Sequence, residues 1–276
     1  MIAFTSVFHP SDFTTGDEAA FAHALKIALS VRGKLSLLHV GGPDEDAHWS
    51  DFPGVRETLS RWGLAPAGAD REAVTALGLD VHKVLRTARD VMEGILGYAY
   101  ENQPDLIVLA THQRAGLARL LHKAMAEPIA RQSQSITLFV PRRIMGFVSA
   151  ETGLVRLRNI VIPVAQSPRP QRAIEAAIAL GAALGAGPAH LSLIYVGEDS
   201  DMPECHVSPP AGWTFEQSAW KGSVVEHILA VAEDRNADLI AMATEGRRGF
   251  LDALRGSTTE RVLQGARCPV LAVPAG

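Results

Sequence analysis

The stretches "PDLIVLATHQRAG" (104–116) and "ADLIAMATEGRRG" (237–249) are two versions of one pattern, and they decide the fold. Around them, residues 91–141 align with residues 224–274 without a gap. The identical pairs include Glu93/Glu226, Ile95/Ile228, Asp105/Asp238, Leu106/Leu239, Ile107/Ile240, Ala110/Ala243, Thr111/Thr244, Arg114/Arg247, Gly116/Gly249, Glu127/Glu260 and Pro141/Pro274. A self-match of this length indicates a duplicated domain.

The beginnings of the two copies also correspond. The string "FTSVFHP" near the start pairs with "RNIVIPV", and "KLSLLHV" pairs with "HLSLIYV". We therefore expect a first domain at residues 1–141 and a second, shortened domain at residues 158–276. The stretch between them, residues 142–157, has the length and mixed polarity of a linker.

Each copy alternates short apolar runs with helical patterns. In the first copy we expect an Ala-rich helix at 17–33 that ends at Gly33. The expected strands lie near residues 3–8, 34–40, 80–85, 105–110 and 136–140. Runs such as "DLIVLA" are apolar on both faces, as in a sheet covered on both sides. This alternation predicts an α/β fold of two tandem doubly wound parallel-sheet domains.

The copies differ after their second strand. The first copy has room for a helix at 52–63, "FPGVRETLSRWG". The second copy has the shorter, proline-rich stretch 197–212, "GEDSDMPECHVSPPAG", which suits no helix of that size. We expect that one face of the second sheet has lost a helix and that something else covers it.

Composition excludes several classes of protein. The chain has 276 residues, is 47% hydrophobic and carries a formal charge of −4, which suits two ordinary domains and argues against nucleic acid as a partner. No apolar run approaches the roughly 20 residues of a membrane span. The first residues resemble a strand more than a signal peptide. Cys205 and Cys268 lie far apart in the sequence, so we expect a reduced, cytoplasmic protein.

The glycines and hydroxyls of "ATEGRRGFLDALRGSTTE" (243–260) follow an expected strand, where doubly wound sheets bind ligands. Gly246 and Gly256 would let the backbone approach a ligand closely. Ser257 would begin a helix whose free N–H groups suit a phosphate, with Arg247 as a charged clamp. The alternative is that Ser257 only caps its helix and the glycines only form turns. The stretch matches neither a Walker loop nor a dinucleotide fingerprint.

With these features the chain resembles the universal stress protein family over nearly all of both copies. Nucleotide-binding members of that family carry Gly-x2-Gly-x9-Gly-Ser/Thr after the fourth strand. The matching residues here are Ala243, Gly246, Gly256 and Ser257, with alanine in place of the first glycine. "CPVLAVP" (268–274) matches the closing strand. The resemblance implies an adenine-nucleotide alpha-hydrolase-like fold whose two last strands pair, so that the copies form a pseudo-dimer and cover their apolar edges.

The resemblance also implies a ligand, namely ATP or another adenine nucleotide, which Mg²⁺ would accompany. Adenine would lie near the end of the first strand and beside an apolar residue that ends the second strand. The glycine motif would hold the ribose and the phosphates. The implied contacts in the second copy are Pro163, Val164, Val196, Met242, Ala243, Gly246, Arg247, Gly256, Ser257, Thr258 and Thr259.

Neither copy has a complete set of these residues. The first copy has Asp12, which matches an acidic residue placed near adenine in the family, and Val40 at the end of its second strand. Its glycines are replaced by Gln113 and Lys123, whose side chains would fill the phosphate space. The second copy keeps the glycines but has Ala165 where the acid would be. We therefore expect nucleotide in the second copy only.

Other chemistry is poorly supported by the sequence. Cys205 and His206 lie among acidic residues, but adjacent residues lack the spacing of zinc ligands. We expect His9 and His39 to be packed or hydrogen-bonded, and His112 to be the histidine best placed for a ligand. No nucleophile is paired with a recognisable base. We therefore expect no catalytic residue and no metal-ligating residue.

These observations favour a stress-response protein that binds an adenine nucleotide in its second domain as a switch or sensor, with little or no catalysis. One alternative is an interaction scaffold whose motifs are relics, and another is a slow ATPase. The expected partner is a small-molecule nucleotide. The sequence identifies no protein partner, and it leaves homo-oligomer formation open.

Overall fold

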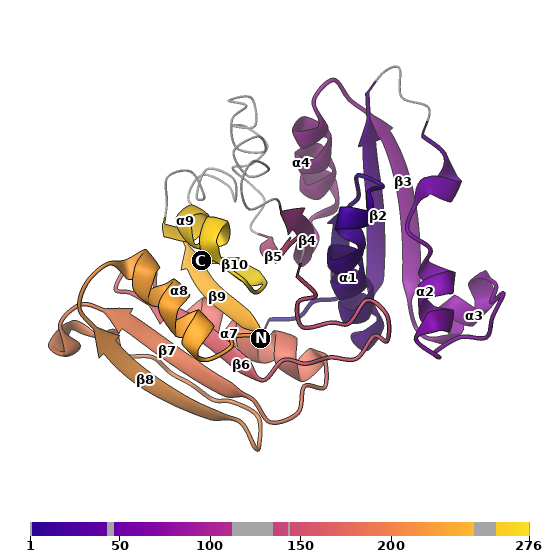
Figure 1. Ribbon diagram of the computed structural model, residues 1–276. Helices are drawn as coiled ribbons and strands as arrows, with labels where there is room; N and C mark the ends of the chain where they lie inside the picture. Colours follow the sequence, from indigo (N-terminus) through magenta and orange to yellow (C-terminus); the bar gives the residue numbers. More distant parts are fainter. Residues whose placement is uncertain (1, 43–46, 112–134, 143, 246–257, 276) are drawn as a thin grey trace.

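The computed structural model describes residues 2–42, 47–111, 135–142, 144–245 and 258–275. Its strands form one ten-stranded sheet of order β3-β2-β1-β4-β5-β10-β9-β6-β7-β8 (Figure 1). The strands are β1 Ser6–Pro10, β2 Lys34–Gly41, β3 Asp80–Thr87, β4 Leu106–Thr111, β5 Ile136–Pro141, β6 Asn159–Val164, β7 His190–Val196, β8 Thr214–Trp220, β9 Leu239–Thr244 and β10 Val270–Pro274. All five strands expected in the first copy are present.

Helices cover both faces of the sheet, as the doubly wound prediction requires. The described α-helices are α1 Glu18–Ser30, α2 Val55–Arg61, α3 Arg71–Ala76, α4 Val91–Asn102, α7 Gln171–Ala183, α8 Val224–Asp234 and α9 Thr258–Gly265. Buried residues of α1, α2 and α7 belong to one apolar core. Buried residues of α4, α8 and α9 belong to the core on the other face. The chain is thus an α/β protein with two tandem doubly wound halves.

The two halves join through their last strands. β5 and β10 pair antiparallel, with Leu138 opposite Leu271, whereas every other pair of neighbouring strands is parallel. Both leucines are fully buried. Each of the two cores contains residues from both halves, so the apolar interior is continuous across the junction. The predicted pseudo-dimer is confirmed.

Paired aspartates show the duplication at the level of single hydrogen bonds. The Asp105 carboxylate accepts from the backbone N–H of Ser6 at 2.9 Å, and the Asp238 carboxylate accepts from that of Asn159 at 3.0 Å. Ser6 and Asn159 pair with Lys34 and His190, the first residues of β2 and β7. The structure therefore matches Ser6 of the first half to Asn159 of the second. An ungapped alignment of "FTSVFHP" with "RNIVIPV" would match Thr5 to Asn159, so the two alignments differ by one residue. The structural alignment also matches Asp12 to Ala165, as expected.

The end of α1 differs by one residue from the sequence-based expectation. Its left-handed residue is Arg32, with φ 51°, and not Gly33. Gly33 is required for another reason, because a Cβ there would lie 2.3 Å from the Thr5 carbonyl oxygen. In the second half, Gly185 with φ 61° occupies the position that Arg32 has in the first. A glycine near a helix end can thus be required for close packing while the residue before it adopts the left-handed conformation that ends the helix.

The stretch between the halves packs into the core. Phe147, Val148 and Leu157 are almost fully buried, and the Trp62 indole N–H donates to the Ala150 carbonyl oxygen at 3.0 Å. His23 of α1 anchors the segment, because its Nε2 accepts from the backbone N–H groups of Phe147 and Val148 at 3.1 and 3.2 Å. The boundaries at 141/142 and 157/158 remain predictions, but the joining segment is a packed element.

The predicted loss of a helix in the second half is confirmed. The first half has α2 and α3 between β2 and β3, whereas between β7 and β8 the chain has only a short 3-10 helix, Asp199–Asp201, and an irregular segment. This segment lies over α7, where the Gln171 side-chain amide bonds both the N–H and the C=O of His206, at 3.1 and 3.0 Å. The Trp213 ring lies on Gly181, where a Cβ would come within 2.3 Å of it.

Candidate functional site

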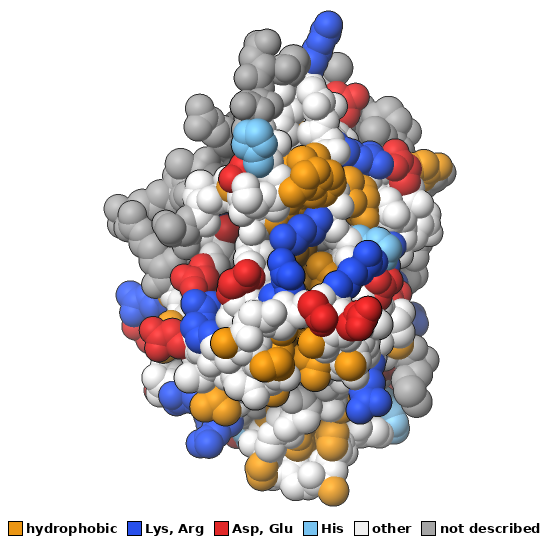
Figure 2. Space-filling view, turned by 90° about the vertical axis from the view of Figure 1, so that its right-hand side faces the viewer, with side chains coloured by type: hydrophobic (Ala, Val, Ile, Leu, Met, Phe, Trp, Pro, Cys, Tyr) orange, Lys and Arg blue, Asp and Glu red, His pale blue; other side chains and the backbone are white. Residues whose placement is uncertain are grey.

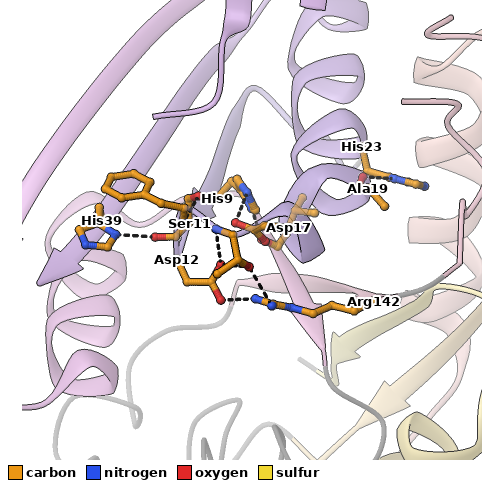
Figure 3. Close-up of polar contacts among 11 residues, drawn as sticks. His9, Ser11, Asp12, Asp17, Ala19, His23, His39 and Arg142 are labelled. Carbon is orange, nitrogen blue, oxygen red and sulfur yellow. Dashed lines mark hydrogen bonds and ion pairs between the residues drawn. The ribbon is translucent and has the colours of Figure 1, made fainter. Parts of the chain in front are cut away.

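The expected site residues that the structure describes lie at the carboxyl ends of the parallel strands in each half and at the start of α9. In the first half, Asp12 follows β1 and is held from two sides (Figure 3). The Arg142 guanidinium, just after β5, donates to Asp12 Oδ2 and, at 2.9 Å, to Thr14 Oγ1. Asp12 Oδ1 accepts from the backbone N–H of Thr14 at 3.1 Å and from its hydroxyl at 2.6 Å. Partial burial raises the pKa of Asp12, but the hydrogen bonds from Thr14 and Arg142 outweigh it and lower the pKa.

Arg142 also closes the space above the loop after β1. A Cβ at Gly16 would lie 2.8 Å from Arg142 Nη1, so only glycine lets the guanidinium lie there. The side chain is 15% exposed. An Asp12 carboxylate held in this way has its oxygens already engaged by the protein.

Two rings fill the neighbouring space at the end of β2. Phe13, with φ 60°, places its ring on the His39 imidazole, with centroids 3.8 Å apart and planes 11° from parallel. His39 Nδ1 donates to the Ser11 carbonyl oxygen at 2.9 Å, which fixes the imidazole (Figure 3). Val40, the other first-half residue expected near adenine, is buried, and a Cβ at Gly94 of α4 would come within 2.6 Å of it. The aromatic surface in this half is thus covered by the protein's own side chain.

A buried pair lies beneath this cluster. His9 is fully buried, with Nδ1 2.9 Å from the Val108 carbonyl oxygen and Nε2 3.3 Å from Asp17 Oδ2. Burial lowers the pKa of His9, but the Asp17 carboxylate and the Val108 carbonyl raise it by more, so the pKa is raised overall. His9 and His39 are packed, hydrogen-bonded histidines, as expected from the sequence.

The same edge of the second half has a different character. Pro163 ends β6 with Val164, Val196 ends β7, and Met242 and Ala243 lie near the end of β9. Val164 and Met242 are buried, whereas Pro163, Val196 and Ala243 are each partly accessible. Val40 near the end of β2 and Val196 at the end of β7 occupy equivalent positions, yet only Val196 remains partly exposed.

Thr258 and Thr259 begin α9, and Thr259 is buried. Since β9 and β10 are parallel, α9 runs back between them, and its first residues lie at the carboxyl edge of the sheet. The remaining expected contacts, Gly246, Arg247, Gly256 and Ser257, lie outside the described residues. So do His112, Gln113 and Lys123 of the first half.

The polar groups beside this second edge are engaged elsewhere. Ala165 occupies the position of Asp12, and the next residue, Gln166, donates to the Asp201 carbonyl oxygen at 2.8 Å. Arg172 of α7 donates to the Pro274 carbonyl oxygen at 3.0 Å. The described part of this edge therefore presents apolar side chains and lacks the ion pair of the first half.

Sequence reasoning missed Arg142, Phe13 and Asp17. Arg142 was assigned to the linker, although its place directly after the last strand of the first half was a usable signal, because that position lies at the ligand edge of a parallel sheet. Phe13 gave no signal, since its ring direction depends on a left-handed backbone that the sequence does not reveal. Asp17 resembled an ordinary residue at a helix start.

The Cys205–His206 stretch is occupied by structural contacts. The Cys205 thiol donates to the Pro203 carbonyl oxygen at 3.4 Å, and the His206 ring bonds Ser208. Within the described ranges, no group of three or more His, Cys, Asp or Glu side chains is placed to hold a metal ion. No helix in the same ranges is long and apolar enough to cross a membrane.

Comparison with known proteins agrees with the fold and the repeat. A profile described as the universal stress protein family matches residues 4–141 and 208–274, which is most of the chain. The chain belongs to the universal stress protein family.

Individual relatives support this assignment. Universal stress protein MJ0531 of Methanocaldococcus jannaschii is 45% identical over 53 residues, which are 19% of this chain and 31% of that protein. A crystal structure of a universal stress protein from Archaeoglobus fulgidus superposes with a TM-score of 0.64 at 19% identity, covering 100% of this chain and 99% of its own. A functionally unknown protein from Pseudomonas aeruginosa gives a TM-score of 0.61 at 14% identity, with 99% and 93% covered. At these identities the two structures show a shared fold over the whole tandem chain.

Proposed function

We propose that this universal stress protein binds an adenine nucleotide, such as ATP with Mg²⁺, in its second half. Binding would act as a cytoplasmic switch or sensor with little or no turnover. The observation that carries the proposal is the contrast at the two ligand edges. Arg142 engages Asp12, Phe13 covers His39 and Val40 is buried, whereas Val196, the equivalent of Val40, remains partly accessible in the second half.

The residues of the second half suit a purine and its phosphates. Apolar side chains at the ends of β6, β7 and β9 can pack against a base, and a helix N-terminus beside a glycine-rich stretch can accept phosphates. A bound nucleotide would supply negative charge, and Mg²⁺ would partly neutralise it. Pro163, Val196 and Ala243 can pack against a ligand but cannot transfer a proton.

The test is calorimetric titration of ATP–Mg into the full chain and two variants. Gly256→Lys places in the second half the residue that the first half has at Lys123. Its long side chain would occupy phosphate space, so we expect binding to be lost with an unchanged melting curve. The added positive charge works in the other direction, by about 0.3–1 kcal/mol, which is too little to offset steric exclusion.

Asp12→Asn is the matched control in the first half, and we expect it to leave ATP affinity unchanged. If Asp12→Asn lost affinity and Gly256→Lys kept the wild-type affinity, the ligand would bind in the first half, which would contradict the proposal. No binding of ATP–Mg by the wild-type chain would overturn the proposal and favour the interaction scaffold.

A further inference from the structure

A second candidate site lies on the outer side of the first half, away from β9 and α9 of the second half. An open pocket of about 840 Å³ is lined by residues of α2, α3, the 3-10 helix Trp49–Asp51 and the edge strand β3. Figure 2 shows this side of the molecule, where Lys and Arg side chains lie beside hydrophobic ones and beside Asp and Glu side chains. The volume is within the range of small-molecule sites. The second half has no such pocket wall, because it lacks the counterparts of α2 and α3 among its described elements.

The floor of the pocket is apolar and its rim is aromatic. Phe52, Val55, Val74 and Leu79 line it and are almost fully buried. Trp49 lies at the rim with 59% of its surface exposed, and its ring is nearly parallel to Phe52, with centroids 5.9 Å apart and planes 18° apart. A flat ring could extend this aromatic pair while burying the indole.

Three cations line the same pocket, namely Arg56, Arg71 and Lys83. Lys83 Nζ lies 5.5 Å from the Phe52 ring centroid. Burial lowers the pKa of Lys83, and nearby Arg56 adds to this while Glu57 opposes it. Among the described residues, none of the three cations forms an ion pair with a carboxylate.

The two lining carboxylates are turned to other groups. Asp80 lies 2.7 Å from His82 Nε2. Glu57 is folded back over the start of α2, where a Cβ at Gly54 would lie 2.5 Å from its Oε2. The pocket lining therefore has three cations and two carboxylates, of which Glu57 partly compensates Lys83, so an excess of positive charge lies beside the apolar floor.

We propose that this pocket binds a small aromatic carboxylate. The ring would pack on Phe52 and Trp49, and the carboxylate would receive charge-assisted hydrogen bonds from Lys83 and Arg71. An inorganic anion would leave the Trp49 ring at the rim exposed to water, and a neutral aromatic molecule would remove water from the cations without compensation. Only a ligand with both parts satisfies both surfaces.

The probe is 1-naphthoate, titrated calorimetrically into the full chain beside its neutral analogue 1-naphthylmethanol. We expect saturable binding of naphthoate that is at least about tenfold tighter than that of the alcohol, because a charge-assisted contact is worth roughly this factor. Lys83→Gln and Arg71→Gln should each weaken naphthoate binding by about tenfold or more. Lys221→Gln, on the second half, is the matched control and should bind as the wild type does.

The outcomes separate this site from the nucleotide site. Naphthoate binding should persist when ATP–Mg is present in excess, and it should persist even if the chain binds no nucleotide. Equal affinity for acid and alcohol, or wild-type affinity in both Lys83→Gln and Arg71→Gln, would overturn the proposal. Arg71 is exposed at the start of α3, so its variant remains a test if Lys83→Gln fails to fold.

Discussion

The two halves of this chain share a sheet topology, yet they differ at both places where a ligand could bind. At the carboxyl edge, the first half is closed by an ion pair and a stacked ring, and the second presents apolar side chains. On the outer face, the first half has two helices that wall a pocket, and the second has an irregular segment held by Gln171. A duplicated fold can thus keep its core pattern while the surfaces of its two halves diverge.

The comparison depends on the halves folding as one unit, and the β5–β10 junction tests this most strongly. Leu138→Ala and Leu271→Ala each remove a fully buried side chain, one from each half. We expect each to lower the free energy of unfolding by about 2–5 kcal/mol. Because both apolar cores run through the junction, urea unfolding should remain a single transition in both variants. Two separate transitions would show that the halves are independent.

A buried histidine should make the first half sensitive to acid in a way that has no counterpart in the second. His23 accepts two backbone N–H bonds through Nε2 and donates from Nδ1 to the Ala19 carbonyl oxygen at 2.7 Å, so only the neutral ring fits. Burial lowers its pKa from 6.5 to about 4, although the Ala19 contact opposes this. The equivalent residue of α7 is Ala176, which cannot titrate.

Because the folded pKa is below the unfolded one, the unfolded chain binds the proton more readily between pH 6.5 and about 4. The stability contributed by neutral His23 is complete above pH 6.5, and about 3 kcal/mol is lost as the pH falls to 4. His23→Gln keeps an acceptor and a donor without the titration. As the pH falls across this window, the stability advantage of the wild type over His23→Gln should therefore shrink or reverse. Parallel pH profiles would show that His23 is not the sensitive group.

How far the sequence could predict this molecule depended on periodicity and repetition. The strands and the helices between them followed from apolar patterns that occur twice, because burial forces them. The pairing of the last strands was implied by the resemblance to the universal stress protein family. The closure of the first site did not follow, because Arg142 comes from the stretch assigned to the linker and Phe13 needs a left-handed backbone. Contacts between residues that are far apart in the sequence, such as His23 with Phe147, leave no local sequence pattern that could predict them. The pocket at Lys83 escaped prediction for the same reason.

The segment that replaces the missing helix offers a smaller test. Gln171→Ala removes two hydrogen bonds to the His206 backbone, and since they lie at the surface we expect a loss of about 1–2 kcal/mol. Amide hydrogen exchange should accelerate in residues 202–212 and stay unchanged in α2 of the first half. Gln264→Ala on α9, whose side chain bonds only Glu260 among the described residues, is the control. Unchanged exchange in 202–212 would mean that Trp213 and its neighbours hold the segment without Gln171.

The smallest expected effect concerns Arg142, whose equivalent in the second half is Ala275. Arg142→Gln removes the positive charge beside Asp12 but leaves the Thr14 hydrogen bonds in place. The pKa of Asp12 should rise toward its ordinary value, measured by carbon NMR of the carboxyl group, because Arg142 is one of the causes that lower it. Global stability should fall by less than about 1 kcal/mol near neutral pH, since the carboxylate is half exposed and water screens the pair. That small loss should vanish in acid, where Asp12 is protonated in both proteins. An Asp12 pKa that stays the same in the variant would mean that Thr14 alone holds the carboxylate. Arg142 would then make no contribution to the ionisation of Asp12 at this edge of the first half.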